Sequence, residues 1–321
     1  MGSDFIRFLL TEQADVSVIN FDKLTYAGNL ENLREVENNP RYRFIKGDIA
    51  DKEAVAVELA ASTFDAVVNF AADTHVDRSI ADAEAFVKTD VLGTHTLLEQ
   101  VRQLKIPRFV QISTDEVYGS TETGEFTESS PFEPNSPYAA SKAGGDLLCR
   151  AYFQTFGTPV IVTHSCNNFG PYQYPEKVIP LFVTNIVEGK KVPLYGDGLN
   201  EREWIFVRDH SRAVWTILQN GKLGETYNIG TGWRISNIEL TKKVLEHMGV
   251  GQDRIERVAD RLGHDRRYAL SAAKLRTLGW APTGTFDDHL AITMNWYKTH
   301  RDWWQPLLKK EHDKRSEDVN P

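Results

Sequence analysis

Short runs of β-branched and other apolar residues alternate along the chain with longer segments of helical periodicity, and this alternation restricts the fold more than any other feature. Several of the short runs are almost continuously apolar, as strands covered on both faces are. Strands that alternate with helices form right-handed βαβ units around a parallel sheet. The sequence therefore predicts an α/β fold with a doubly wound parallel sheet, whose strand candidates are 16–20, 42–47, 65–72, 108–114, 160–165 and 226–230.

The alternation becomes looser after Ser165, where loops rich in Pro, Gly and Tyr separate shorter elements. We therefore expect two domains. Residues 1–166, with a return of about 200–231, are predicted to form the parallel-sheet domain. Residues 167–321 are predicted to form a smaller α/β lobe, with a frayed tail over 307–321 because that segment is charged and lacks apolar periodicity.

Composition excludes several classes of protein. The net charge of −8 disfavours a nucleic-acid partner, because phosphate binding needs a basic surface, but it permits a small anionic substrate in a local basic pocket. No apolar run is long enough to span a bilayer, so we expect no membrane association. Two cysteines cannot form a disulfide framework, and no Cys/His spacing suggests a metal site, so the sequence predicts a cytoplasmic protein without a metal.

The chain opens as a helix rather than as a strand. Dinucleotide-binding units open with a strand, a glycine-rich turn and a helix whose backbone N–H groups face a diphosphate. Only the last glycine of such a turn could be present, as Gly2. Three explanations stay open: a misassigned start, a vector-derived Met-Gly-Ser, or a fold that binds no dinucleotide. Asp22 counts against the third, because an acidic residue about twenty residues after the turn binds the ribose of a dinucleotide.

Tyr138 and Lys142 form a Tyr-x-x-x-Lys pair at the start of a helix, which Ser136 can cap and Pro137 can begin. Residues four apart share a helix face, so the ammonium can lie beside the phenol. A neighbouring cation lowers a tyrosine's pKa, which lets the phenolate accept a proton from a sugar hydroxyl. The alternative is an ordinary surface pair, because this spacing occurs often by chance.

Thr114, Asp115 and Glu116 follow a buried strand candidate directly. Ligands bind at the carboxyl ends of strands in open α/β sheets. Two carboxylates in one pocket can adopt different protonation states, so that one serves as acid and the other as base. Solvated acids at a strand exit are the alternative.

The motifs of this sequence together resemble those of the extended short-chain dehydrogenase/reductase family, and the Thr-Asp-Glu triplet resembles the dTDP-glucose 4,6-dehydratases within it. The resemblance covers nearly the whole chain and implies a Rossmann-type first domain that lacks its first strand and a second lobe that binds a nucleotide sugar. The matching blocks are STDEVYG at 113–119, PYAASK at 137–142, NFAADTHVDRS at 69–79, NNFGPYQYPEK at 167–177, YGDG at 195–198 with Arg202, and RLGHDRRY at 261–268.

The resemblance implies a role for each catalytic candidate. Tyr138, assisted by Thr114 and Lys142, deprotonates the C4 hydroxyl of glucose while hydride passes to NAD⁺. Glu116 then removes the acidified C5 proton, Asp115 protonates the departing C6 hydroxyl, and hydride returns to C6. A homodimer is also implied, through a four-helix bundle formed by helices 83–104 and 138–156.

The resemblance also implies two sets of binding residues. The residues predicted to contact NAD are Gly2, Asp22, Lys23, Asp48, Ile49, Ala71, Ala72, Thr89, Tyr138 and Lys142. The residues predicted to contact the nucleotide sugar are His75, Thr114, Asn167, Glu176, Lys177, Arg202, Asn237, Arg267 and Tyr268. Guanidinium groups suit a diphosphate because they bind it through two hydrogen bonds.

Three departures from the family pattern have consequences. Asp73-Thr74 stands where Glu-Ser is common, and His164-Ser165-Cys166 replaces a run that usually contains Arg. The absent first strand is expected to weaken NAD binding and folding, because neighbouring strands lose backbone partners. Equal melting temperature and NAD affinity with that strand restored would contradict this expectation. The alternative functions are an NAD-dependent nucleotide-sugar epimerase or decarboxylase, or a non-catalytic nucleotide-sugar binder.

Overall fold

The computed structural model describes residues 1–260 and 263–309 of the chain. Contacts divide the chain into two units. The first comprises Met1–Asn168, Glu203–Trp233 and Asp265–Pro282, and the second comprises Phe169–Arg202, Arg234–His264 and Thr283–Pro321. Strands β6 (Asn167–Phe169) and β8 (Glu201–Phe206) contain two of the positions where the chain passes from one unit to the other.

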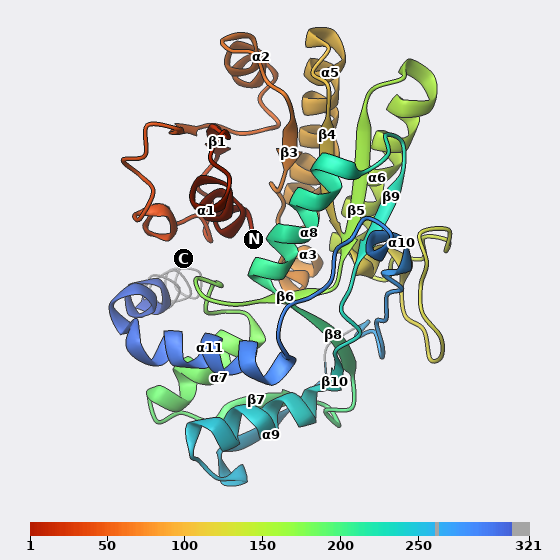
Figure 1. Cartoon of the computed structure of the whole chain (residues 1–321). Coiled ribbons are helices and arrows are strands. Elements are labelled where there is room, and N and C mark those ends of the chain that lie inside the picture. The colour runs from red at the N-terminus through yellow and green to blue at the C-terminus, as the bar shows by residue number, and fades with distance from the viewer. Residues whose placement is uncertain (261–262, 310–321) are drawn as a thin grey trace. The chain divides into compact units, whose positions relative to one another are not determined.

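Parallel strands form the centre of the first unit (Figure 1). Four of them lie in the order β3-β4-β5-β9, with Phe109 opposite Val160 and Val162 opposite Thr226. Two more, β1 and β2, pair with Val18 opposite Tyr42. Their bounds are Val18–Asp22 for β1, Tyr42–Lys46 for β2, Val67–Asn69 for β3, Phe109–Thr114 for β4, Val160–Ser165 for β5 and Thr226–Ile229 for β9.

Helices cover both faces of this sheet. On one face, α1 and α8 pack over Val110, Ile112 and Ile161. On the other, α2, α5 and α6 pack over alternate residues of the same strands, among them Phe109 and Val160. Because successive strand residues point to opposite faces, one strand contributes to both cores. The predicted doubly wound parallel sheet is confirmed.

The helical elements of the first unit are, in chain order, α1 (Gly2–Glu12), η1 (Leu30–Leu33), α2 (Lys52–Ala60), α3 (Val76–Ala81), α4 (Glu84–Phe86), η2 (Val87–Gly93), α5 (Thr94–Leu104), η3 (Asp115–Tyr118), α6 (Pro137–Phe156), α8 (Val207–Asn220) and α10 (Ala273–Arg276). Helix α1 is held against α8 by a buried carboxylate: Asp4 accepts a hydrogen bond from Ser211 at 2.7 Å and pairs with Arg208 at 3.2 Å.

Two predicted elements differ from those observed. The first strand runs over Val18–Asp22 rather than 16–20, because its pairing with Tyr42–Lys46 sets its bounds. The predicted helix 83–104 is interrupted by the π-helix η2. Such a segment carries a wider turn and occurs often at functional sites.

The parallel sheet lies in two parts. Among the described residues, no strand pairs with β1 on the side away from β2, and none pairs with β3 on the side away from β4. The pairings β1-β2 and β3-β4 end at these two edges.

The second unit contains a smaller set of elements. Its β7 (Val192–Tyr195) and β11 (Ile255–Val258) pair in parallel, and α7 packs against α9 and α11. Capping boxes begin α9 at Ser236 and α11 at Thr285. The remaining bounds are Val178–Val187 for α7, Arg234–Ser236 for β10, Asn237–Met248 for α9, Gln252–Arg254 for η4 and Phe286–Thr299 for α11.

Residues 265–282 lie in the first unit, whereas the sequence placed them in the second lobe. The reason is a bridge between Phe126 and Leu270, together with burial of Leu270, Leu275 and Trp280 in the core beside β4 and β5. Of the predicted frayed tail, residues 307–309 are helical and 310–321 lie outside the described residues. No described helix is long and apolar enough to cross a membrane.

Candidate active site

The end of strand β4 carries the predicted triplet in a short turn. Thr114 caps the 3₁₀ turn η3: its hydroxyl accepts a hydrogen bond from the Glu116 backbone at 3.2 Å and donates to Asp115 at 3.3 Å. Thr114 is 7% exposed and Asp115 is 2% exposed. Asp115 is therefore held in the protein interior, whereas Glu116 is partly exposed, so a fully solvated pair of acids does not describe this turn.

Helix α6 presents Tyr138 and Lys142 beside this turn. Ser136 accepts a hydrogen bond from the Ala139 backbone at 3.1 Å and Pro137 is the first helical residue, as the sequence predicted. Both side chains are buried, and the Lys142 ammonium donates to the Ile112 carbonyl of β4 at 2.8 Å. The pair is therefore part of the interior and not an ordinary surface pair.

The phenol of Tyr138 lies within reach of all three residues of the triplet. Burial raises the pKa of Tyr138 well above its ordinary value, the carboxylate of Glu116 raises it further, and a hydrogen bond with Thr114 opposes the shift. The sequence predicted a lowered pKa from the neighbouring ammonium. Without the nicotinamide cation that the prediction also invoked, the direction is opposite, because burial removes the phenolate from water and the carboxylates of Glu116, Asp90 and Asp115 act on it.

Asp90 is a site residue that sequence reasoning missed. It lies on the π-helix η2, is 1% exposed, and accepts a hydrogen bond from Ser141 at 2.7 Å. Burial raises the pKa of Asp90 to about 6, although the ammonium of Lys142 lowers it. A single aspartate in a helical segment gave no signal, since its burial depends on the packing of η2 against α6.

Replacing Asp90 with Asn is expected to stabilise the protein above pH 6. The folded-state pKa lies above the ordinary 3.8, so the folded state binds more protons and stability falls as pH rises between about 3.8 and 6. A shift of this size corresponds to about 3 kcal/mol. Denaturant unfolding at pH 4 and pH 8 measures the effect. The variant should gain stability at pH 8 and little at pH 4; an equal difference at both pH values would contradict the prediction.

The predicted adenosine-side residues are brought together at the carboxyl ends of β1 and β2. Asp22 is the last residue of β1, and its side chain accepts a hydrogen bond from the Leu24 backbone at 2.7 Å. Lys23 pairs with Asp48 at 2.7 Å, and Asp48 precedes the buried Ile49. Burial raises the pKa of Asp48, but the contacts with Lys23 and with the Ala50 backbone outweigh this effect, so the pKa lies below its ordinary value.

The other predicted cofactor residues follow β3 and flank η2. Ala71 donates its backbone N–H to Asn69 at 3.2 Å, and Ala72 follows it. Thr89 on η2 donates to Asp73 at 3.1 Å, so the predicted ribose-side threonine faces the loop after β3. Gly2 opens α1, where an added Cβ would contact Phe70 at 3.4 Å.

The predicted substrate residues are divided between the two units. In the first unit lie His75, Thr114, Asn167, Arg267 and Tyr268. His75 precedes α3, and Asn167 opens β6. Arg267 donates to the Gly124 carbonyl at 2.8 Å, and the Tyr268 hydroxyl donates to Asp265 at 2.6 Å. These contacts hold the 265–268 segment beside the loop that follows η3.

In the second unit lie Glu176, Lys177, Arg202 and Asn237. Lys177 is 3.9 Å from Glu176, and Arg202 donates to the Glu201 carbonyl at 2.8 Å. Asn237 is the first residue of α9 and donates its backbone N–H to Asn200 at 2.9 Å. Of the block that the sequence analysis matched at 261–268, Arg261 and Leu262 lie outside the described residues.

The chemistry of these groups fits a nicotinamide dinucleotide. Asp22 supplies a carboxylate at a strand end for ribose hydroxyls, and Lys142 supplies a buried donor beside Tyr138 at the redox end. Gly2 leaves the start of α1 without a side chain, as close approach of a diphosphate requires.

Comparison with known proteins agrees with this geometry. A family model described as GDP-mannose 4,6 dehydratase matches residues 1–293. The chain is 50% identical over 311 residues to the dTDP-glucose 4,6-dehydratase of Streptomyces griseus, with 96% of this chain and 94% of that protein covered. It is also 50% identical over 297 residues to the low-salt glycan biosynthesis protein Agl12 of Haloferax volcanii, with 92% and 95% covered.

Among solved structures, the chain resembles DesIV (dTDP-glucose 4,6-dehydratase) from Streptomyces venezuelae with NAD and TYD bound. The TM-score is 0.93 and the identity 51%, with 95% of this chain and 96% of that chain covered. With about half of its residues shared over nearly the whole length, the chain belongs to the dTDP-glucose 4,6-dehydratase family.

Proposed function

We propose that this protein converts dTDP-glucose into dTDP-4-keto-6-deoxyglucose and water with NAD as its cofactor. The observation that carries the proposal is the grouping of Thr114, Asp115 and Glu116 around the buried phenol of Tyr138. An epimerase needs only the redox pair, whereas removal of water also needs an acid and a base beside it. The two carboxylates therefore favour the dehydratase.

Each proton transfer of the proposed reaction is assigned to one side chain of the site. A bound NAD would supply the hydride-transfer chemistry at C4 and C6, and Asp22, Lys142 and Tyr138 are among the residues that would hold it. Tyr138 accepts the proton of the C4 hydroxyl, with Thr114 and Lys142 orienting the phenol and the ribose side of the cofactor. Glu116 removes the C5 proton that the 4-keto group has acidified. Asp115 gives a proton to the departing C6 hydroxyl, which leaves as water, and Glu116 returns a proton to C5.

A turnover assay tests the proposal. Purified protein is incubated with NAD⁺ and dTDP-glucose, and the product is analysed by mass spectrometry. We expect a product lighter by one water, and UDP- and CDP-glucose as parallel substrates measure nucleobase preference. A product of unchanged mass with inverted stereochemistry would show that the protein is an epimerase and not a dehydratase. No conversion of any of the three substrates would contradict the proposal.

A homodimer formed through a four-helix bundle is part of the proposal. Helix α6 packs against η2 and α5. Both α6 and η2 keep large apolar side chains at their surface. Four of them are about half exposed, namely Val87 at 47%, Leu92 at 54%, Leu147 at 55% and Phe156 at 54%. A second copy of the same surface would cover them.

Leu147→Glu is expected to convert this dimer into a monomer, because a charge would be buried in the apolar interface. Size-exclusion chromatography with light scattering measures the mass. Ile292→Glu is a matched control, since Ile292 is 50% exposed on α11, which is not one of the helices of the proposed bundle. A Leu147→Glu protein of unchanged mass would contradict the four-helix arrangement.

We also propose that the protein works in a reducing compartment such as the cytoplasm. Its two cysteines, Cys149 and Cys166, are both free and buried. Burial raises the pKa of both thiols well above the ordinary value, which keeps them protonated and unreactive.

A further inference from the structure

A line of buried polar side chains lies behind the turn that carries the two acids. Ser113 donates to Asp146 Oδ2 at 2.6 Å, and His164 Nε2 lies 3.2 Å from the same oxygen. The other ring nitrogen of His164, Nδ1, lies 2.6 Å from the Tyr118 hydroxyl, which also donates to Asn228 at 2.9 Å. All five side chains are at most 5% exposed. We call these five residues the Asp146–His164 relay.

The relay connects both ends of the turn η3, which carries the two acids, to the carboxylate of Asp146. Ser113 directly precedes Thr114, and Tyr118 is the last residue of η3. Asp146 holds the first end directly and holds the second end through His164. Asp115 and Glu116 lie between these two anchors, so the direction of their side chains depends on where the anchors hold the backbone.

The same carboxylate belongs to the helix of the redox pair. Asp146 lies on α6 four residues after Lys142, which lies four after Tyr138, so the three share a face of the helix. The relay therefore fixes the position of the turn that carries Asp115 and Glu116 relative to Tyr138. Sites built from two elements need such a connection, because displacement by about 1 Å can cost roughly 100-fold in rate.

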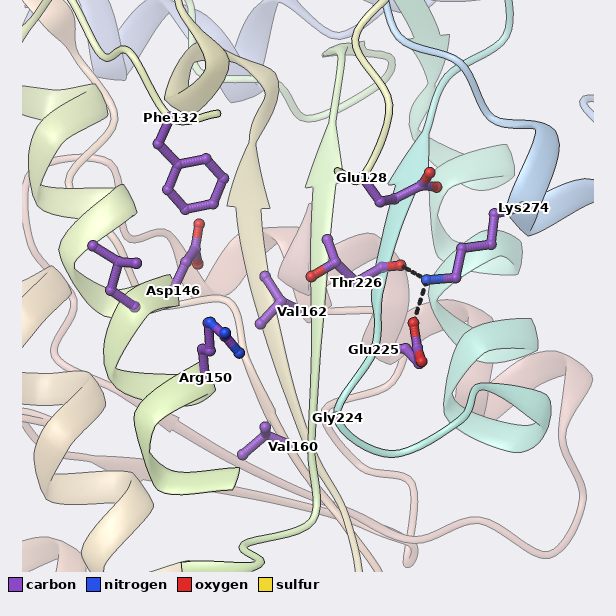
Figure 2. A pocket seen from close by; sticks show the side chains of 11 residues that line it. Glu128, Phe132, Asp146, Arg150, Val160, Val162, Gly224, Glu225, Thr226 and Lys274 are labelled. Atoms are coloured by element: carbon purple, nitrogen blue, oxygen red, sulfur yellow. Dashed lines mark hydrogen bonds and ion pairs between the residues drawn. The ribbon is translucent and has the colours of Figure 1, made fainter. Parts of the chain in front are cut away.

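Asp146 uses only one of its oxygens in the relay. Its Oδ1 has no hydrogen-bond partner among the described residues, and the carboxylate lines a cavity of about 280 Å³. Figure 2 shows Asp146 beside Phe132 in this cavity, with Arg150 on the same helix and Lys274 joined to Glu225 on the far side. Both contacts of Asp146 in the relay therefore converge on Oδ2.

The His164 ring is also fixed by aromatic neighbours. Its centroid lies 4.8 Å from that of Tyr118 and 5.5 Å from that of Phe132, with the rings near perpendicular. The ring therefore cannot rotate away from the line between Tyr118 and Asp146 without displacing these side chains. Buried polar connections of this kind favour one geometry of the groups that they join.

We propose that His164 is a positioning residue for the elimination step, acting through Tyr118 and Asp146 on the placement of Asp115 and Glu116. The inference rests on the proposed function. It assigns no contact between His164 and the substrate. It predicts that loss of the link through His164 and Tyr118 impairs removal of the C5 proton and of the C6 hydroxyl more than it impairs C4 oxidation. The reason is that Lys142 stays held by the Ile112 carbonyl, and the Ser113 link to Asp146 still holds the end of the turn next to Thr114.

The test uses Tyr118→Phe, His164→Gln and the double variant. Tyr118→Phe removes one hydroxyl, and His164→Gln keeps an amide near Asp146 while withdrawing the partner of Tyr118. Thr163→Val is the matched control, since Thr163 is a fully buried neighbour on β5 whose hydroxyl donates to the Gln111 carbonyl at 3.2 Å. Thermal melts of all four variants check that each one is folded.

Each single relay variant is expected to lower kcat by roughly 10- to 100-fold. The KM for dTDP-glucose should stay within about 2-fold, since binding is unchanged. In a single turnover, reduced nicotinamide should form at the rate of the unaltered protein and then persist, because elimination is delayed. The double variant should match the slower single variant, since both changes cut one connection.

Two results would overturn the inference. One is a kcat for the relay variants equal to that of Thr163→Val. The other is an equal slowing of C4 oxidation and of product formation, which indicates general damage to the fold. Failure of the proposed function is distinguishable, because the unaltered protein would then form neither reduced nicotinamide nor a dehydrated product.

Discussion

Tyr138→Phe is expected to lower kcat by about 1,000-fold, because loss of a positioned general base costs roughly 100- to 10,000-fold. In the proposed mechanism the Tyr138 hydroxyl accepts the C4 proton, whereas the other phenol of this region, Tyr118, is engaged with His164 and Asn228. Initial rates of product formation at saturating dTDP-glucose measure kcat. Reduced nicotinamide should fail to appear in a single turnover, since the missing proton transfer accompanies C4 oxidation.

Tyr152→Phe is the matched control for this variant. Tyr152 lies on the same helix and donates to Glu99 at 2.7 Å, away from the catalytic turn. It should retain the kcat of the unaltered protein. A Tyr138→Phe protein that keeps a tenth or more of the original kcat would assign C4 deprotonation to another group.

The protonation state of Tyr138 is set by opposing effects on its pKa. Burial and the Glu116 carboxylate raise the pKa of Tyr138, so the phenol is protonated at neutral pH before ligands bind. A cationic nicotinamide ring beside it would favour the phenolate and act in the opposite direction. The proposed mechanism therefore requires the bound cofactor to offset the effects that keep the phenol protonated.

Glu116→Gln is expected to stop the reaction after C4 oxidation. The amide keeps the shape of the side chain but cannot accept the C5 proton, so kcat should fall by roughly 100- to 10,000-fold. Because Tyr138 and Lys142 are intact, reduced nicotinamide should accumulate on mixing with dTDP-glucose, and its absorbance can be followed directly. Exchange of the C5 hydrogen with deuterium from D₂O should be lost in parallel.

Glu122→Gln is a suitable control because Glu122 is an exposed acid in the loop that follows the same turn. It should leave both the absorbance trace and the exchange unchanged. Continued exchange at C5 in Glu116→Gln would show that another residue removes the C5 proton. Asp115 would then be the candidate, because it lies in the same turn.

Much of the fold could be predicted because it depends on local patterns. The strand 160–165 follows from the β-branched run that opens it, and the helix beginning at Pro137 follows from the Ser136–Pro137 start signal. The prediction of one helix over 83–104 was less accurate, because the π-helix η2 that interrupts this segment has no local signature in the sequence. Residues 265–282 were assigned to the wrong unit because their place depends on contact with Phe126 and the core of the first unit.

The sequence by itself determined which chemical groups the site contains. Thr114, Asp115 and Glu116 follow a strand, and Tyr138 and Lys142 share a helix face, so their types and spacing follow from neighbouring residues alone. Only the tertiary structure decided how these groups behave. The raised pKa of Tyr138, the burial of Asp90 and the connection of His164 to Tyr118 arise between residues 22 or more positions apart, where packing removes water and brings charges together.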